Sequence, residues 1–216
     1  MSKLINRAFL FLFVFGTAIN VQAQKQLDKG TLVFEITEAK ADDEQMNAQM
    51  GMVKGGKTTI IFEGEQQRMD VNMMGGMVNM KTLSEKDGGA KMIMDMMGQK
   101  ILINVSKEEQ EASTPEFDYD IKKDESDTKE ILGYKCVKYT IKQTGGGMNI
   151  EMEAYVTDQI KTQRSIIDQA KGLDLDGTPL QYTVHNMGMH ITTLATDIKD
   201  TIEENAFNPS TEGYKE

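Results

Sequence analysis

The chain has 216 residues, with 24 lysine and arginine residues against 34 aspartate and glutamate residues, a formal net charge of −10, one cysteine and 17 methionines. This length is typical of one domain. The acidic balance argues against nucleic acid as a partner, because binding it requires a basic surface that releases counterions. The single cysteine excludes a fold held together by intramolecular disulfides.

Residues 1–23 have the pattern of an export signal. Lys3 and Arg7 precede an apolar run at residues 8–19, and the small residue Ala23 ends the segment. The run is shorter than the roughly 20 apolar residues that a membrane-spanning helix needs, so we expect no transmembrane segment after its removal. We predict cleavage after Ala23 or one residue later, and a periplasmic or secreted protein. Without Lys3 and Arg7 its net charge is 22 − 34 = −12.

Alternating apolar and polar residues recur along the rest of the chain, which is the pattern of strands with one buried face. The clearest examples are residues 68–73 (RMDVNM), 91–96 (KMIMDM) and 148–156 (MNIEMEAYV). Short links that contain glycine separate them and favour hairpins. We therefore predict a mainly β (α+β) fold, a curved antiparallel sheet or half barrel with one or two short helices, in a single domain over residues 24–216.

Helical periodicity is limited to two segments. Residues 41–53 begin with acids and carry Met46, Met50 and Val53 at helical spacing, and residues 162–171 end before Gly172. Between the two halves of the predicted sheet, residues 107–130 hold ten acids and Pro115. We interpret this segment as a solvated acidic loop.

Four segments carry a resemblance to a known family: ILGYKCVKYTI (131–141), AYVTDQI (154–160), DGTPLQYTV (176–184) and FNPSTEGYKE (207–216). From Lys29 to the C-terminus the order of motifs resembles a large family of secreted proteins that contain a domain of unknown function. That family is similar in architecture to the periplasmic lipoprotein carrier proteins. The resemblance implies an antiparallel sheet curled into a half barrel around an apolar cavity, partly closed by helices.

Methionine dominates the faces of three predicted strands. An unbranched thioether changes rotamer at little cost and suits binding surfaces that accept ligands of varied shape. If these faces line a concave surface, a lipid, an acyl chain or another apolar molecule would fit there. The alternative is an ordinary core without a ligand. The candidate lining residues are Met69, Val71, Met73, Met92, Met94, Met96, Met148, Ile150 and Met152.

Residues 185–190 (HNMGMH) permit a second interpretation. Two imidazoles and two thioethers within six residues, His185, Met187, Met189 and His190, are donors that copper or silver prefers. Asn186 and Gly188 are also residues that favour turns, so the segment can equally be a hairpin turn at a solvent-exposed edge. These two interpretations stay open at the level of the sequence.

No residue pattern indicates catalysis. His185 and His190 have no candidate nucleophilic serine or cysteine close to them in sequence. We interpret Cys136 as a buried strand residue. We therefore expect a non-enzymatic protein without a cofactor, whose function is to bind an apolar ligand. The alternatives are a methionine- and histidine-rich metal-binding protein, or an envelope module that contacts another protein and holds no small ligand.

Overall fold

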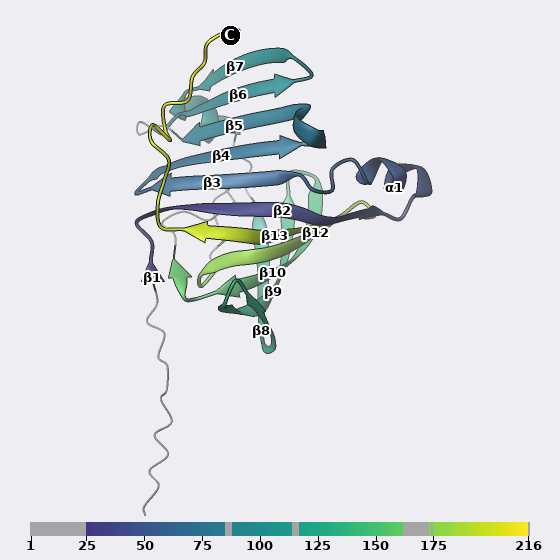
Figure 1. Ribbon diagram of the computed structural model, residues 1–216. Helices are drawn as coiled ribbons and strands as arrows, with labels where there is room; N and C mark the ends of the chain where they lie inside the picture. Colours follow the sequence, from purple (N-terminus) through teal and green to yellow (C-terminus); the bar gives the residue numbers. More distant parts are fainter. Residues whose placement is uncertain (1–24, 85–87, 114–116, 162–172, 174, 216) are drawn as a thin grey trace, which may run out of the picture.

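The computed structural model describes residues 25–84, 88–113, 117–161, 173 and 175–215. Its main feature is an antiparallel sheet of eleven strands in the order β7-β6-β5-β4-β3-β2-β13-β12-β10-β9-β8. Figure 1 shows that the strands from β7 to β2 lie side by side in an open sheet, and that the sheet curls where β12 to β8 follow. The predicted mainly β class with a curved antiparallel sheet is confirmed.

The sheet consists of two meanders that meet where β2 pairs with β13. The first contains β2 (Lys29–Ala41), β3 (Lys57–Glu63), β4 (Gln66–Met73), β5 (Val78–Ser84), β6 (Ala90–Met96) and β7 (Gln99–Val105). The second contains β8 (Asp118–Ile131), β9 (Tyr134–Gly145), β10 (Met148–Thr157), β12 (Thr178–Asn186) and β13 (Met189–Lys199). A separate parallel pair joins β1 (Lys25–Gln26) to β11 (Ile160–Lys161).

Two-residue turns connect several of these strands, as the glycine-containing links predicted. In three of these turns a residue other than glycine is followed by glycine, and both residues have positive φ, which matches the twist of the flanking strands. The turns are Met97–Gly98 (φ 54° and 86°), Leu132–Gly133 (52° and 82°) and Met187–Gly188 (48° and 74°).

Isoleucine, leucine and phenylalanine, rather than methionine, form the fully buried core. One cluster lies where β2, β3, β12 and β13 meet and includes Leu32, Phe34 and Leu180, whose exposed fractions are 0–1%. A second cluster surrounds Ile141 on β9 and Ala154 on β10. The ring centroids of Phe34 and Tyr182 lie 6.1 Å apart, and Tyr182 packs against both clusters, so the same face of the sheet carries both.

One of the two predicted helices can be compared with the structure. Residues 41–53 contain α1 (Glu44–Met50), which begins where the side chain of Asp43 accepts a hydrogen bond from the backbone N–H of Met46. Helix α1 projects beyond the end of β2 (Figure 1). The segment 162–171 lies outside the described residues. None of the helices in the described part of the chain is long and apolar enough to cross a membrane.

The prediction of an acidic loop at residues 107–130 is wrong. Residues Lys107–Ser113 form α2, and residues from Asp118 onward form the edge strand β8. Because β8 has one partner strand and few apolar residues, its alternation was not visible in the sequence. Lysines compensate some of its acids, since Asp127 forms an ion pair with Lys138 of β9 and Asp120 forms one with Lys122 of β8 itself.

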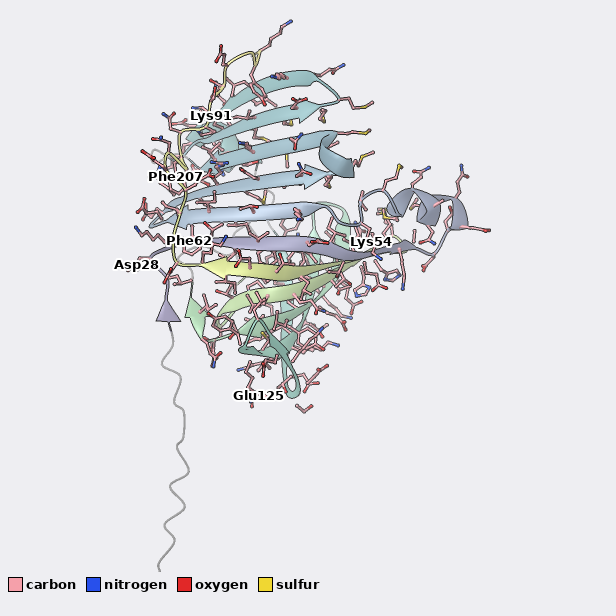
Figure 2. The ribbon with its side chains drawn as sticks, in the orientation of Figure 1. Asp28, Lys54, Phe62, Lys91, Glu125 and Phe207 are labelled. Carbon is pink, nitrogen blue, oxygen red and sulfur yellow. The ribbon has the colours of Figure 1, made fainter. Side chains whose placement is uncertain are left out.

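The last described residues do not join the sheet as a strand of their own. Residues 200–215 run from the end of β13 across the strand ends toward β7 (Figure 1), and Phe207 of this segment appears between Phe62 and Lys91 in Figure 2. There the backbone of Lys215 accepts a hydrogen bond from Leu102 and donates one to Lys100. The C-terminal segment therefore spans the first meander and protects part of the free edge of β7.

Candidate apolar ligand face

Strand register places the methionines of β4, β5 and β6 on one face of the sheet. Met69, Val71 and Met73 of β4 lie opposite residues of β5 that in turn lie opposite Met92, Met94 and Met96 of β6. Directly paired residues of antiparallel strands share a face. We call the resulting surface the methionine face; it consists of Met69, Val71, Met73, Val78, Met80, Met92, Met94, Met96, Ile101 and Ile103.

The methionine face continues the core outward and becomes more exposed with each strand. Ile60 of β3, which pairs with Met69, is 2% exposed. The side chains that β4 and β5 contribute to this face are half-buried, and at the far side Met96 is 40% and Ile103 38% exposed. Charged residues of these strands occupy the other face because they alternate with the apolar ones. The result is a mainly apolar, uncharged surface, with Thr82 between Met69 and Met92, that the described residues leave partly open.

Two of the three candidate residues on β10, Ile150 and Met152, lie on the same face but in another part of the molecule. Strands β3, β2, β13 and β12 separate β10 from β4. Met152 packs against the cluster around Ile141, together with Leu173 and Leu175. Ile150 pairs with Gln143 and is half-buried, while Met148 pairs with Gly145 at the hairpin end. The structure therefore brings the six candidates of β4 and β6 together and does not join the β10 candidates to them.

The alternation in β4 suggested that the opposite face of the first meander is exposed to solvent. In the structure, part of that face is buried. Arg68 is 5% exposed, and its cross-strand neighbours Ile61 and Leu83 are equally buried. The guanidinium donates hydrogen bonds to the side chains of Asp70 and Glu203 and to the backbone carbonyl of Ala206. The Asp70 hydrogen bond is the largest cause of a raised Arg68 pKa. This contact could not be predicted from the sequence, because Glu203 and Ala206 are more than 130 positions away from Arg68.

His185 and His190 lie directly opposite each other at the tip of the β12–β13 hairpin. Their Nδ1 atoms are 2.6 Å apart, and Nε2 of His190 is 3.4 Å from a carboxylate oxygen of Asp42. Met187 is in the turn and 84% exposed. Met189 is adjacent to His190 in the strand and so occupies the other face. Residues 185–190 thus contain a hairpin turn, and Met187 and Met189 do not lie with the two histidines on one face.

Cys136 is fully buried, as expected, and is a free thiol. Its Sγ lies 3.6 Å from the backbone carbonyl of Tyr134. Burial raises the pKa of this thiol to about 12. A neutral, inaccessible thiol is a packing residue and not a nucleophile.

The chain was compared with known proteins. No curated protein matches its sequence. Among solved structures, it is similar to the lipoprotein LppX of Mycobacterium tuberculosis, with a TM-score of 0.42, 8% identity and coverage of 82% of this chain and 89% of that one. It is also similar to LprF of Mycobacterium bovis, with a TM-score of 0.37, 8% identity and coverage of 82% and 90%.

A family match covers most of the sheet. It begins at residue 44, at the start of α1, and ends at residue 211, in the C-terminal segment that lies over the first meander. It therefore includes every strand of the methionine face as well as the β12–β13 hairpin. Because residues 44–211 match the family described as Domain of unknown function (DUF4412), the protein belongs to that family.

Proposed function

We propose that the protein is a non-enzymatic binding protein outside the cytoplasm that holds an acyl chain against the methionine face. The observation that carries this proposal is a group of partly exposed apolar side chains on four adjacent strands, interrupted by Thr82 between Met69 and Met92 and without a charged side chain. Large apolar surfaces that stay partly open often mark ligand-binding sites. An acyl chain needs no hydrogen bonds and is matched by such a surface.

The composition of the face favours a flexible, linear ligand over one with a fixed shape. Six of its ten members are methionines, on β4, β5 and β6. Thioether side chains adapt to different ligand conformations because they have several accessible rotamers. The strands of this region have seven or eight residues, which corresponds to a length of roughly 25 Å, enough for a long acyl chain to lie along one strand.

The absence of tryptophan from the sequence offers a direct test. Met94→Trp places a single tryptophan on the methionine face, and Lys81→Trp places one on the opposite face of the neighbouring strand. A brominated fatty acid quenches only a tryptophan that it contacts. We expect saturable quenching of the tryptophan at position 94 and none at position 81. Equal quenching at both positions, or none at either, would exclude an acyl chain at this face.

Native mass spectrometry of the protein purified from its own envelope identifies the ligand independently. We expect a species heavier than the bare chain that releases a lipid or fatty acid on organic extraction. Bare chain alone, together with a co-purified protein that remains bound after extraction, would favour the envelope module without a small ligand.

A further inference from the structure

We propose that His185 and His190 form a two-histidine site for a divalent transition-metal ion, with Cu(II) bound most tightly. The two residues are a directly opposed pair in the β12–β13 hairpin, and both rings are half-buried. They lie on the face of the sheet opposite to Tyr182, because residues 182 and 185 differ by an odd number of positions in a regular strand. This site is thus on the other side of the sheet from the acyl-chain face and does not depend on it.

The distance between the two Nδ1 atoms is closest to that between neighbouring ligands of a square-planar ion. The two Nδ1 atoms are 2.6 Å apart. With metal–nitrogen bonds of about 2.0 Å, two neighbouring ligands of a square-planar ion are separated by about 2.8 Å, and those of a tetrahedral ion by about 3.3 Å. A linear Cu(I) site requires about 4.0 Å. Small side-chain rotations therefore suffice for square-planar Cu(II), and larger ones are needed for Zn(II) or for Cu(I).

The surroundings prepare His190 to bind a cation, and His185 must move its hydrogen from Nδ1 to Nε2 when the ion binds. A contact of 2.6 Å between two Nδ1 atoms requires that one of them carries no hydrogen. The carboxylate of Asp42, 3.4 Å from Nε2 of His190, favours a hydrogen on that nitrogen and leaves Nδ1 of His190 free to donate its lone pair. Asp42 is itself held near the turn, because its backbone N–H donates to the carbonyl of Gly188.

Carboxylates outnumber lysines around the two rings: Asp42, Glu38 and Glu151 lie near them, and Lys40 and Lys142 form ion pairs with Glu38 and Glu151. Glu151 of β10 lies directly opposite His185, and Glu38 of β2 is close enough to His190 to interact with it electrostatically. Lys40, which lies opposite His190, forms an ion pair with Glu38. Within the described residues no group of three or more histidine, cysteine, aspartate or glutamate side chains is arranged around one point. Water would therefore complete the coordination of an ion held by two imidazoles.

This assignment differs from a thioether site for Cu(I). Met189 pairs with Ala41 and faces away from the two rings. The distance between the two Nδ1 atoms is too short for linear coordination. Imidazole nitrogen is a good ligand for Cu(II), and a site built from nitrogen and oxygen donors binds Cu(II) more tightly than Ni(II) or Zn(II).

The test is a titration of the untagged protein with Cu(II), followed by calorimetry and by electron paramagnetic resonance. We expect one equivalent to bind with a spectrum that shows nitrogen ligands. The variants His185→Ala and His190→Ala should each lose this equivalent. Asp42→Asn should weaken it by about tenfold, the effect of removing a carboxylate that orients a histidine ligand.

Thr183 and Thr192 provide the matched control. They form the next directly opposed pair on the same face of the hairpin, with their hydroxyl oxygens 3.0 Å apart. The double variant Thr183→Val/Thr192→Val perturbs the hairpin as much and should bind Cu(II) as the original protein does. Met187→Leu should also leave binding unchanged. Far-UV circular dichroism verifies that each variant is folded.

Two results would overturn the proposal. One is the absence of Cu(II) binding tighter than that of the denatured chain. The other is an equally tight equivalent in the folded double variant His185→Ala/His190→Ala. Because neither histidine is on the methionine face, the fatty-acid quenching experiment should give the same result in this double variant. Failure of the metal site and failure of acyl-chain binding are therefore distinguishable.

Discussion

Nη1 of Arg68 donates a hydrogen bond of 2.7 Å to the backbone carbonyl of Ala206, and this contact joins β4 to the C-terminal segment across 138 positions of sequence. Arg68 also binds the carboxylates of Asp70 and Glu203. A buried guanidinium with three acceptors fixes a segment that has few apolar residues of its own. Asp70 is also 3.9 Å from Lys81, so the arrangement extends to β5.

Arg68→Met should lower the free energy of unfolding by about 2 kcal/mol, because it leaves the carbonyl of the buried Ala206 and the partly buried carboxylate of Asp70 without their donor. Urea unfolding monitored by circular dichroism measures this loss. Deletion of residues 204–216 should cost a similar amount, and the two changes together should cost less than their sum because they break the same contacts. Lys81→Met, which removes an exposed charge nearby, should change stability by less than about 0.5 kcal/mol. Full additivity of the deletion and Arg68→Met would contradict the anchoring role.

Met94→Asp should abolish binding of an environment-sensitive dye to the methionine face. It should also reduce stability, since a carboxylate on an apolar surface is costly to desolvate. Met94→Gln keeps the length of the side chain without a charge and should weaken dye binding less. Fluorescence titration of the three proteins checks this prediction. A dye that binds none of them, or all three equally, would contradict an apolar site at this face.

Cys136 should resist alkylation in the folded protein at pH 8 and react once urea unfolds the chain. Burial raises the pKa of its thiol from 9.0 to about 12, so the thiol stays neutral in the folded state where the unfolded chain ionises. A raised folded pKa contributes stability that is present below pH 9 and is lost as pH rises toward 12. Cys136→Ala should lack this part of the alkaline decline. Rapid alkylation of the native protein would show that Cys136 is accessible.

Met187→Asn should raise stability by about 0.5–1 kcal/mol, because residue 187 has φ 48° and asparagine adopts this conformation more readily than methionine. The exposed side chain contributes little packing to offset the gain. Thermal unfolding measures the difference. Met46→Asn, in the helix α1 where φ is negative, is the control and should instead lower stability slightly. A decrease for both variants would mean that Met187 makes a stabilising contact.

N-terminal sequencing of the exported protein should begin at Gln24 or Lys25. The basic, apolar and small-residue order of residues 1–23 motivates this prediction. Replacement of Ala23 by a bulky residue such as phenylalanine should block processing and leave a larger precursor. An exported protein that still starts at Met1 would contradict it.

The sequence by itself determined the fold class and the faces of several strands. Period-2 alternation identified the methionine strands β4, β6 and β10, because a strand must separate apolar from polar residues when one side is buried. The same rule failed for β8, an edge strand whose charges are balanced by lysines on β9. Helix α1 was predictable from its acids and the helical spacing of its apolar residues, whereas the acidic composition of residues 107–130 concealed the charged helix α2.

Only the tertiary structure decided which residues meet. Identical alternation in β4 and β10 said nothing of the four strands that lie between them, because the order of strands depends on long-range pairing. The alternation in β4 predicts a solvent-exposed Arg68, but in the structure the C-terminal segment covers it. His185 and His190 were close in sequence, but register alone put their rings in contact and Met189 on the other face. Alternation is a local property that neighbouring residues impose, whereas register, strand order and burial by a distant segment arise when the whole sheet forms.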